Sequence, residues 1–99
     1  MTTKEIEWGA VQGPMSWDAA KELELGGWRL PTVPELTALF DYDKGESREQ
    51  AMAGKDFWSS SSYAANTSYA WYVNFINGYV NYYNKYSSYF VRLVRGVTT

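Results

Sequence analysis

The pair Asn77-Gly78 constrains the fold of this chain more than any other feature. It separates two runs rich in aromatic and β-branched residues, 69–76 and 79–85. Asparagine and glycine both tolerate the positive φ angles of a type I′ turn, which makes this pair a strong signal for a β-hairpin. The sequence therefore predicts two antiparallel strands joined by a two-residue turn.

This turn fixes a register that assigns the hairpin side chains to two faces. Val73 is expected opposite Tyr82 and Tyr72 opposite Tyr83, and side chains alternate between the faces of a strand. One face is expected to point toward the core: Trp71, Val73, Phe75, Val80 and Tyr82. The other face is expected to line the surface: Tyr72, Asn74, Tyr79, Asn81 and Tyr83.

Two helices are expected before the hairpin. Ser16 is a suitable N-cap for a helix over residues 17–25, with Asp18 in the first turn, where a negative charge complements the helix dipole. Thr32 and Glu35 form a capping box, in which the threonine oxygen accepts from one backbone amide and the carboxylate from the other. This motif predicts the start of a second helix.

Strands are expected near both ends of the chain. Residues 6–11 predict a first strand, with Trp8 and Ala10 on the same face. Residues 89–94 predict a last strand, which closes the sheet near the first one. The intervening residues 41–55 are polar and are expected to form a solvated connector.

The composition changes at Phe57. Residues 57–95 contain all five asparagines and eight of the nine tyrosines of the chain, but no carboxylate. Tyrosine offers a large, fairly rigid contact area at low entropic cost, and asparagine and serine add adaptable hydrogen bonding, as in antibody binding surfaces. We expect one domain in which residues 1–56 form a scaffold and residues 57–95 form a ligand face. The candidate ligand-binding residues are Tyr72, Asn74, Tyr79, Asn81, Tyr83, Asn84 and Tyr86.

Cysteine and histidine are both absent. Their absence excludes disulfides, thiolate nucleophiles, imidazole-dependent triads and the usual zinc sites. A hydrolase would need a nucleophile with a base, and residues 57–95 offer only Lys85 and the tyrosines as titrating candidates. We therefore expect no catalytic residue, no metal site and no cofactor.

The charge of the chain is unevenly distributed. Residues 1–56 carry six basic and eleven acidic side chains, a net charge of −5, whereas the remainder carries +3 from Lys85, Arg92 and Arg95. Three cations are too few to follow a phosphate backbone, so nucleic acid is not an expected partner. No apolar run approaches the roughly 20 residues that span a bilayer, so membrane insertion is not expected either. The first residues lack the apolar core of a signal peptide, which leaves localisation open.

Four segments together resemble a known family. EWGAVQGPMSWDAA, GGWRLPTVPELTAL, FWSSSSYAANTSYAWYVNF and VRLVRG are similar to the C-terminal domain family named after the Legionella collagen-like protein, over roughly residues 6–96. The resemblance implies an α+β, C-type-lectin-like fold of the formylglycine-generating-enzyme-like branch, with two helices packed on small twisted antiparallel sheets. It also implies adjacent termini, a ligand face built late in the chain, and display on a cell or virus surface.

The chain departs from these relatives at functional positions. Many family members carry a cysteine in the first helix and another between the final valine-arginine pairs, where this chain has Leu93. The enzymatic relatives use active-site cysteines, and sugar-binding lectins of the wider fold use acidic calcium motifs. Because no acid follows Asp56, the resemblance implies a binding domain without that calcium site and without that catalysis.

The bias toward asparagine, tyrosine and serine suggests a source of sequence variation. Many variable proteins of diversity-generating retroelements use this fold, and those systems mutate adenines, which converts asparagine codons to tyrosine or serine codons. The predicted function is a non-catalytic domain that binds a protein or glycan through a retroelement-diversified surface. Two alternatives stay open, namely a constitutive adhesin or phage-tail receptor-binding module, and a structural homo-oligomerisation domain.

Overall fold

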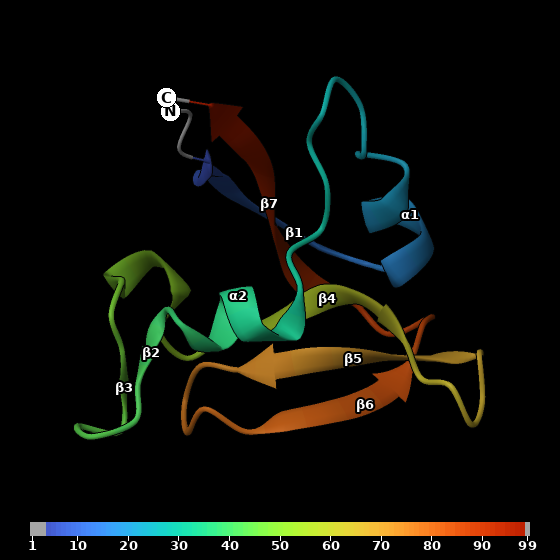
Figure 1. Cartoon of the computed structure of the whole chain (residues 1–99). Coiled ribbons are helices and arrows are strands. Elements are labelled where there is room, and N and C mark those ends of the chain that lie inside the picture. Colours follow the sequence, from blue (N-terminus) through green and yellow to red (C-terminus); the bar gives the residue numbers. More distant parts are fainter. Residues whose placement is uncertain (1–3, 99) are drawn as a thin grey trace.

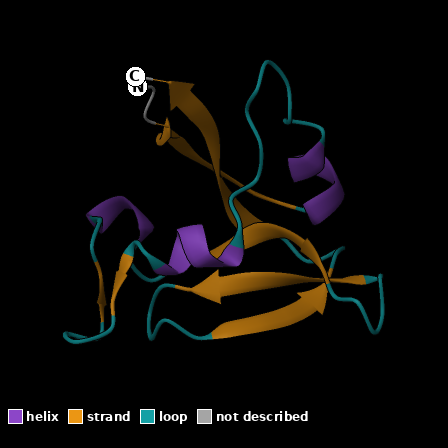
Figure 2. Cartoon of the chain, viewed as in Figure 1, coloured by secondary structure: helices purple, strands orange, loops and turns teal. Residues whose placement is uncertain are grey.

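A five-stranded sheet organises the computed structural model, which describes residues 4–98 (Figure 1). Its strands lie in the order β1 (Lys4–Met15), β7 (Tyr89–Thr98), β4 (Asp56–Ser62), β5 (Tyr69–Asn74) and β6 (Val80–Asn84). The α+β class is confirmed, but the expectation of purely antiparallel sheets is wrong, because β4 and β7 run parallel where Phe57 meets Phe90. β6 forms one edge of the sheet and β1 the other (Figure 2).

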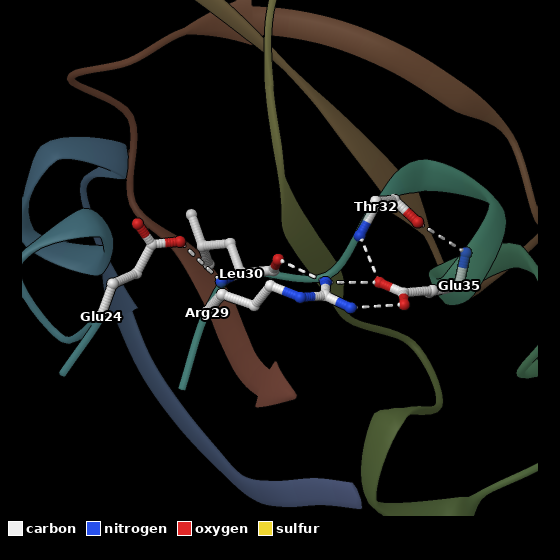
Figure 3. Close-up of polar contacts among 5 residues, drawn as sticks. All are labelled: Glu24, Arg29, Leu30, Thr32 and Glu35. Atoms are coloured by element: carbon white, nitrogen blue, oxygen red, sulfur yellow. Dashed lines mark hydrogen bonds and ion pairs between the residues drawn. The ribbon is translucent and has the colours of Figure 1, made fainter. Parts of the chain in front are cut away.

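The first helix begins where the sequence predicts and ends sooner. In α1 (Trp17–Lys21) the hydroxyl of Ser16 accepts from the amide of Ala19 at 3.2 Å. Only the first turns bury apolar side chains; Leu25, in the expected last turn, is 72% exposed. The helix ends early because the carboxylate of Glu24 accepts from the backbone amide of Leu30 at 2.8 Å and thereby fastens the following loop (Figure 3).

The second helix, α2 (Val33–Thr37), confirms the capping box. Thr32 and Glu35 exchange the two expected backbone hydrogen bonds, at 2.8 and 3.2 Å. The same carboxylate also receives both terminal nitrogens of Arg29, at 2.8 and 2.7 Å (Figure 3). These bonds from Arg29 hold the pKa of Glu35 at about 2, below its ordinary value of 4.5. One carboxylate therefore both starts the helix and joins it to the preceding loop.

Residues 41–55 are more ordered than a solvated connector. β2 (Phe40–Asp41) and β3 (Glu46–Ser47) form a second, two-stranded sheet, followed by a 3₁₀ helix (Gln50–Met52). Met52 is completely buried. The connector therefore contributes to the core as well as to the surface.

The core consists of two clusters that share the central strands. Neighbouring residues of β4 point into different clusters, Phe57 into one and Trp58 into the other, because side chains alternate along a strand. One cluster contains Trp17, Ala20, Leu30, Trp58, Ala70, Val91 and Leu93. The other contains Leu36, Phe40, Met52, Phe57, Val73 and Phe75. Residues 57–95 thus build much of the core in addition to the candidate ligand face.

The two ends of the described chain lie together. Lys4 pairs with Thr98 at the start of β1 and the end of β7 (Figure 1). The register of this pair shifts between Trp8 and Val11, and both of these side chains pack against the second cluster while Ala10 is exposed. A bulge of this kind reverses which residues point inward. Within the described chain, no helix combines the length and apolarity needed to cross a membrane.

Candidate ligand-binding surface

The predicted hairpin forms, but its turn is longer than predicted. Val73 pairs with Val80, and residues 75–79 connect the strands. Asn74 causes the difference, because its side-chain oxygen accepts from the amides of Ile76 at 2.7 Å and Asn77 at 3.2 Å. The pairing is displaced by two positions from the predicted register, and a shift of two leaves each side chain of the strands on its expected face.

Three side chains expected in the core are instead accessible. Val80 is exposed, Tyr82 is 36% exposed, and Trp71 is half-buried. A helix of five residues extends only about 7.5 Å, so α2 covers this face near Val73 and leaves the other end of the hairpin uncovered. β6 is also an edge strand, which explains why Val80 lacks a cover.

The uncovered side chains form an aromatic group that the sequence assignment missed. Tyr63 and Tyr82 stack with their ring centroids 4.0 Å apart and an interplanar angle of 3°. Trp71 meets both rings edge-on, at 5.5 Å from Tyr63 and 5.2 Å from Tyr82, and Tyr69 lies 6.0 Å from Tyr82. The many aromatic residues between 63 and 72 could have indicated this group. The prediction missed it because one face of the hairpin was expected to be fully buried.

The opposite flank of the hairpin is a supported tyrosine stack. Tyr72 was expected at the surface, but it is half-buried and packs on the first core cluster. Its ring lies 4.6 Å from that of Tyr89, which in turn lies 4.7 Å from the buried ring of Trp58. Burial raises the pKa of Tyr89 above its ordinary value. Tyr83 stacks outside this pair, 6.3 Å from Tyr89, and remains 54% exposed.

The candidate asparagines have different local roles. Asn74 donates from its amide nitrogen to the carboxylate of Asp56 at 2.7 Å, in addition to ordering the turn. Burial raises the pKa of Asp56. The side-chain oxygen of Asn84 accepts from the amide of Tyr86 at 2.7 Å. Asn84 pairs with Tyr69 of β5, so its side chain lies on the opposite face of the hairpin from that of Asn81. Asn74 and Asn84 therefore maintain the backbone, while Asn81 is exposed on β6.

The remaining candidate residues fall into two places. Tyr79, 70% exposed, and Tyr83 lie with Asn81 along β6 and its turn. Tyr86, 83% exposed, follows the strand and lines a separate hollow. We define the β6 surface as Tyr79, Val80, Asn81, Tyr82 and Tyr83. The structure thus brings three of the seven candidates together on the β6 surface. Of the others, Tyr72 packs beneath the surface, Asn74 and Asn84 bond the backbone, and Tyr86 lines the hollow.

One family model covers nearly the whole chain. The model described as the Lcl C-terminal domain matches residues 2–95. The chain belongs to the Lcl C-terminal domain family. None of the curated proteins compared with the chain matches it. The family match confirms the resemblance to the Legionella collagen-like protein domain, and the range that matches the Lcl C-terminal domain includes the whole β6 surface.

In this member of the Lcl C-terminal domain family, β6 exposes backbone groups as well as side chains. The amide of Asn74 donates to the carbonyl of Tyr79 at 2.9 Å, and bonded pairs alternate along an antiparallel ladder. Residues 80, 82 and 84 therefore direct their amides and carbonyls away from β5. Asn81 accepts from the amide of Tyr82 at 2.8 Å, which occupies one of these outward donors.

Charged groups near the β6 surface are few. Arg92 pairs with Glu49 at 2.6 Å and Arg95 with Glu7 at 2.7 Å, both away from β6. Among residues 4–98, no group of three or more acidic side chains is arranged to hold a metal ion. What the β6 surface offers a ligand is aromatic area, amide groups and backbone hydrogen bonds.

Proposed function

We propose that this chain is a non-catalytic domain that binds a protein or glycan ligand on a cell or virus surface through its β6 surface. Membership of the Lcl C-terminal domain family suggests a surface-exposed, non-enzymatic domain. The observation that carries the proposal is the exposure of Tyr79, in the hairpin turn, and of Tyr83, on β6, which is an edge strand of the described sheet. Uncharged aromatic surface of this kind usually marks an interaction site.

The tyrosine stack beneath the surface supports the proposal. Tyr83 lies on Tyr89, and Tyr89 lies on the buried Trp58. A ring held in place from below loses little conformational freedom when a ligand covers its outer side, which favours affinity. The tyrosine hydroxyls add polar contacts at the rim of the same rings.

The test is the double variant Tyr79→Ala/Tyr83→Ala. We expect ligand binding to be lost while the melting temperature changes by only a few degrees, because neither side chain belongs to the core. Binding is measured with a glycan array and with pulldown of labelled cell-surface proteins. Leu25→Ala is the matched control, since Leu25 is equally exposed but lies in the loop after α1.

Two results would oppose this function. Ligands bound equally by the wild type and the double variant would mean that β6 is not the binding surface. Collapse of the fold in the double variant would mean that these rings stabilise the core. Loss of binding in Leu25→Ala as well would point to a general defect.

A diversified surface is a further part of the proposal. Exposed Asn81, Tyr82 and Tyr83 of β6 can change without disturbing the buried residues of β5 that face the core, Ala70 and Val73. Mutation of adenines in asparagine codons would account for the asparagine, tyrosine and serine residues found together here. Sequencing the flanking DNA tests this part: we expect a near-identical template repeat and a reverse transcriptase. Absence of both favours a constitutive adhesin or phage-tail module.

We also infer that the chain has the C-type-lectin-like fold. Three features support the inference: paired chain ends, two short helices beside the sheet, and a candidate ligand face formed by late strands. An experimental structure superposed on C-type-lectin-like domains tests it. A different strand order in those domains would remove the fold assignment and leave the β6 proposal intact.

The outward backbone groups of β6 favour one second candidate, a homo-oligomerisation domain. Unpaired edge strands can pair with a second copy. Asn81 opposes such pairing, because its side chain already occupies the outward amide of Tyr82. Mass measurement at several protein concentrations separates the candidates, since a constant monomer mass excludes oligomerisation through β6.

A further inference from the structure

A second, smaller site lies at the end of the hairpin away from the turn. It is a hollow of about 250 Å³ lined by Asp18, Thr67, Ser68, Lys85 and Tyr86. Three segments form it: the first turn of α1, the loop before β5 and the residues after β6. Because these segments are far apart in the chain, the sequence offered no signal for this site.

Backbone hydrogen bonds hold the walls of the hollow together. The amide of Trp17 donates to the carbonyl of Lys85 at 3.0 Å, and the amide of Lys85 donates to the carbonyl of Ser68 at 3.0 Å. Asn66 orders the adjacent loop by accepting from the amide of Ser68 at 3.0 Å. The hollow is therefore formed before any ligand arrives, which lowers the entropic cost of binding.

Among the described residues that line the hollow, only Lys85 is positively charged. Its ammonium donates to the hydroxyl of Ser62 at 2.8 Å and lies 4.1 Å from the centroid of the Trp17 ring. Within residues 4–98 no carboxylate lies within 4.0 Å of this ammonium, although Arg92 and Arg95 each have one. An ammonium has three donors, and Ser62 accepts from one of them, so at least one remains available to a ligand.

Asp18 balances this charge across the hollow. Its carboxylate is exposed and forms no ion pair with a described residue. An anionic ligand would approach Asp18 as well as Lys85, and a cationic ligand would approach Lys85 as well as Asp18. The pair of opposite charges therefore favours a neutral ligand that both accepts and donates hydrogen bonds.

We propose that this hollow binds a single neutral sugar ring. Vicinal hydroxyls can accept from Lys85 and donate to Asp18, while Thr67 and Ser68 offer further hydroxyls. The exposed ring of Tyr86 provides an amphipathic face for the apolar side of a pyranose. The volume is smaller than the roughly 300 Å³ at which sites for drug-sized ligands begin, which suits one ring. The site deepens the proposed binding function but does not depend on the β6 surface.

The experiment is a titration of the isotope-labelled domain, followed by its amide chemical shifts. The probes are the methyl pyranosides of glucose, mannose and galactose, with glucuronate and glucosamine as charged comparators. We expect saturable shifts at Thr67, Ser68 and Lys85 with at least one neutral probe, and weaker shifts with both charged sugars. The dissociation constant should be roughly millimolar, as for a site with few contacts.

Separate variants distinguish this site from the β6 surface. Lys85→Met and Asp18→Asn should each weaken binding of the neutral probe by about tenfold, because each removes a charged hydrogen-bonding partner. Tyr79→Ala/Tyr83→Ala should leave that binding unchanged. Asp18→Asn alters an exposed residue, so it tests the site even if Lys85→Met destabilises the contact with Trp17.

Three results would overturn the sugar site. The first is the absence of saturable shifts with all neutral probes. The second is tighter binding of glucuronate than of any neutral probe, which would indicate an anion site. The third is unchanged affinity in Asp18→Asn and Lys85→Met. Because the two surfaces carry separate variants, failure at the hollow leaves the test of β6 unaffected.

Discussion

Arginine side chains join the acidic first half of the chain to the rest. Arg92 binds Glu49, and its guanidinium also donates to the carbonyl of Gly9 at 2.8 Å. Arg95 binds Glu7 and lies over the ring of Trp28, 4.7 Å from its centroid. These pairs join basic residues of the positively charged part of the chain to acidic residues of the negatively charged part. The partner of Arg95 follows from the pairing of β1 with β7, in which Glu7 lies opposite Arg95, and sequence alone does not fix that pairing.

The pair Arg29–Glu35 predicts a specific dependence of stability on pH. Because the pKa of Glu35 is lowered from 4.5 to about 2 in the folded chain, its stabilising contribution is complete above pH 4.5 and is lost as the pH falls toward 2. Glu35→Gln should therefore lower the melting temperature at pH 7 by a few degrees. The modest size reflects the partial exposure of both side chains.

The measurement is a set of melting curves for the wild type and Glu35→Gln between pH 7 and pH 2. The difference between the two proteins should shrink below pH 4.5 and vanish near pH 2. A difference that stays constant across this range would mean that the charge of Glu35 contributes nothing, and that the substitution acts through the capping bonds alone.

At the scale of elements, the sequence correctly predicted the features that depend on residues close together in the chain. The start of α2 is correct because the capping box involves residues only three apart. The hairpin exists as predicted, but its turn is longer because Phe75 is drawn into the core and Asn74 bonds the turn amides. β4 was missed because its serines favour no strand by themselves. Ser59 is buried there, and its hydroxyl is satisfied by donating to the carbonyl of Trp71 at 2.8 Å.

The hairpin turn predicts a difference between two glycines. Gly78 has φ +78°, and an added Cβ there would lie 2.5 Å from Tyr42 and 2.7 Å from Phe40. Gly45 has a similar φ of +69° but no neighbouring atom within 4 Å of such a Cβ. Gly45→Ala should cost about 1 kcal/mol for the left-handed backbone alone, whereas Gly78→Ala should cost about 1–3 kcal/mol more from the clash.

Urea unfolding of the wild type and the two alanine variants measures how much each substitution lowers the free energy of unfolding. The Gly45 variant isolates the effect of the backbone conformation, so the difference between the variants reports the packing of the turn on Tyr42 and Phe40. Equal destabilisation would show that the two rings move aside without cost and that the turn is not tightly packed.

At the scale of the whole molecule, the candidate site was only partly predictable. The sequence located the tyrosine-rich hairpin and three residues of the β6 surface. It did not predict which side chains are covered, because that depends on how far the short helix α2 and the residues around Trp58 extend over the two sides of the sheet. Trp71, expected in the core, and Tyr72, expected at the surface, are both half-buried for this reason.

The pairing of the chain ends predicts that the domain tolerates circular permutation. A permutant that joins Thr98 to Lys4 through a short glycine-serine linker and opens between Asp43 and Lys44 should fold with a melting temperature within a few degrees of the wild type. The new ends would lie in an exposed turn. Circular dichroism with thermal melting is the measurement. A permutant opened within β5, between Trp71 and Tyr72, is the control and should fail to fold.

The position of β6 relative to the chain ends has a consequence for how the domain is carried. β1, which pairs with β7 where the ends meet, and β6 occupy opposite edges of the sheet (Figure 1). A stalk, anchor or host loop attached at either end would join β1 or β7, on the side of the sheet away from Tyr79 and Tyr83. The tyrosines would then form the distal tip of the assembly, where they meet an approaching surface first and where the attachment does not obstruct them.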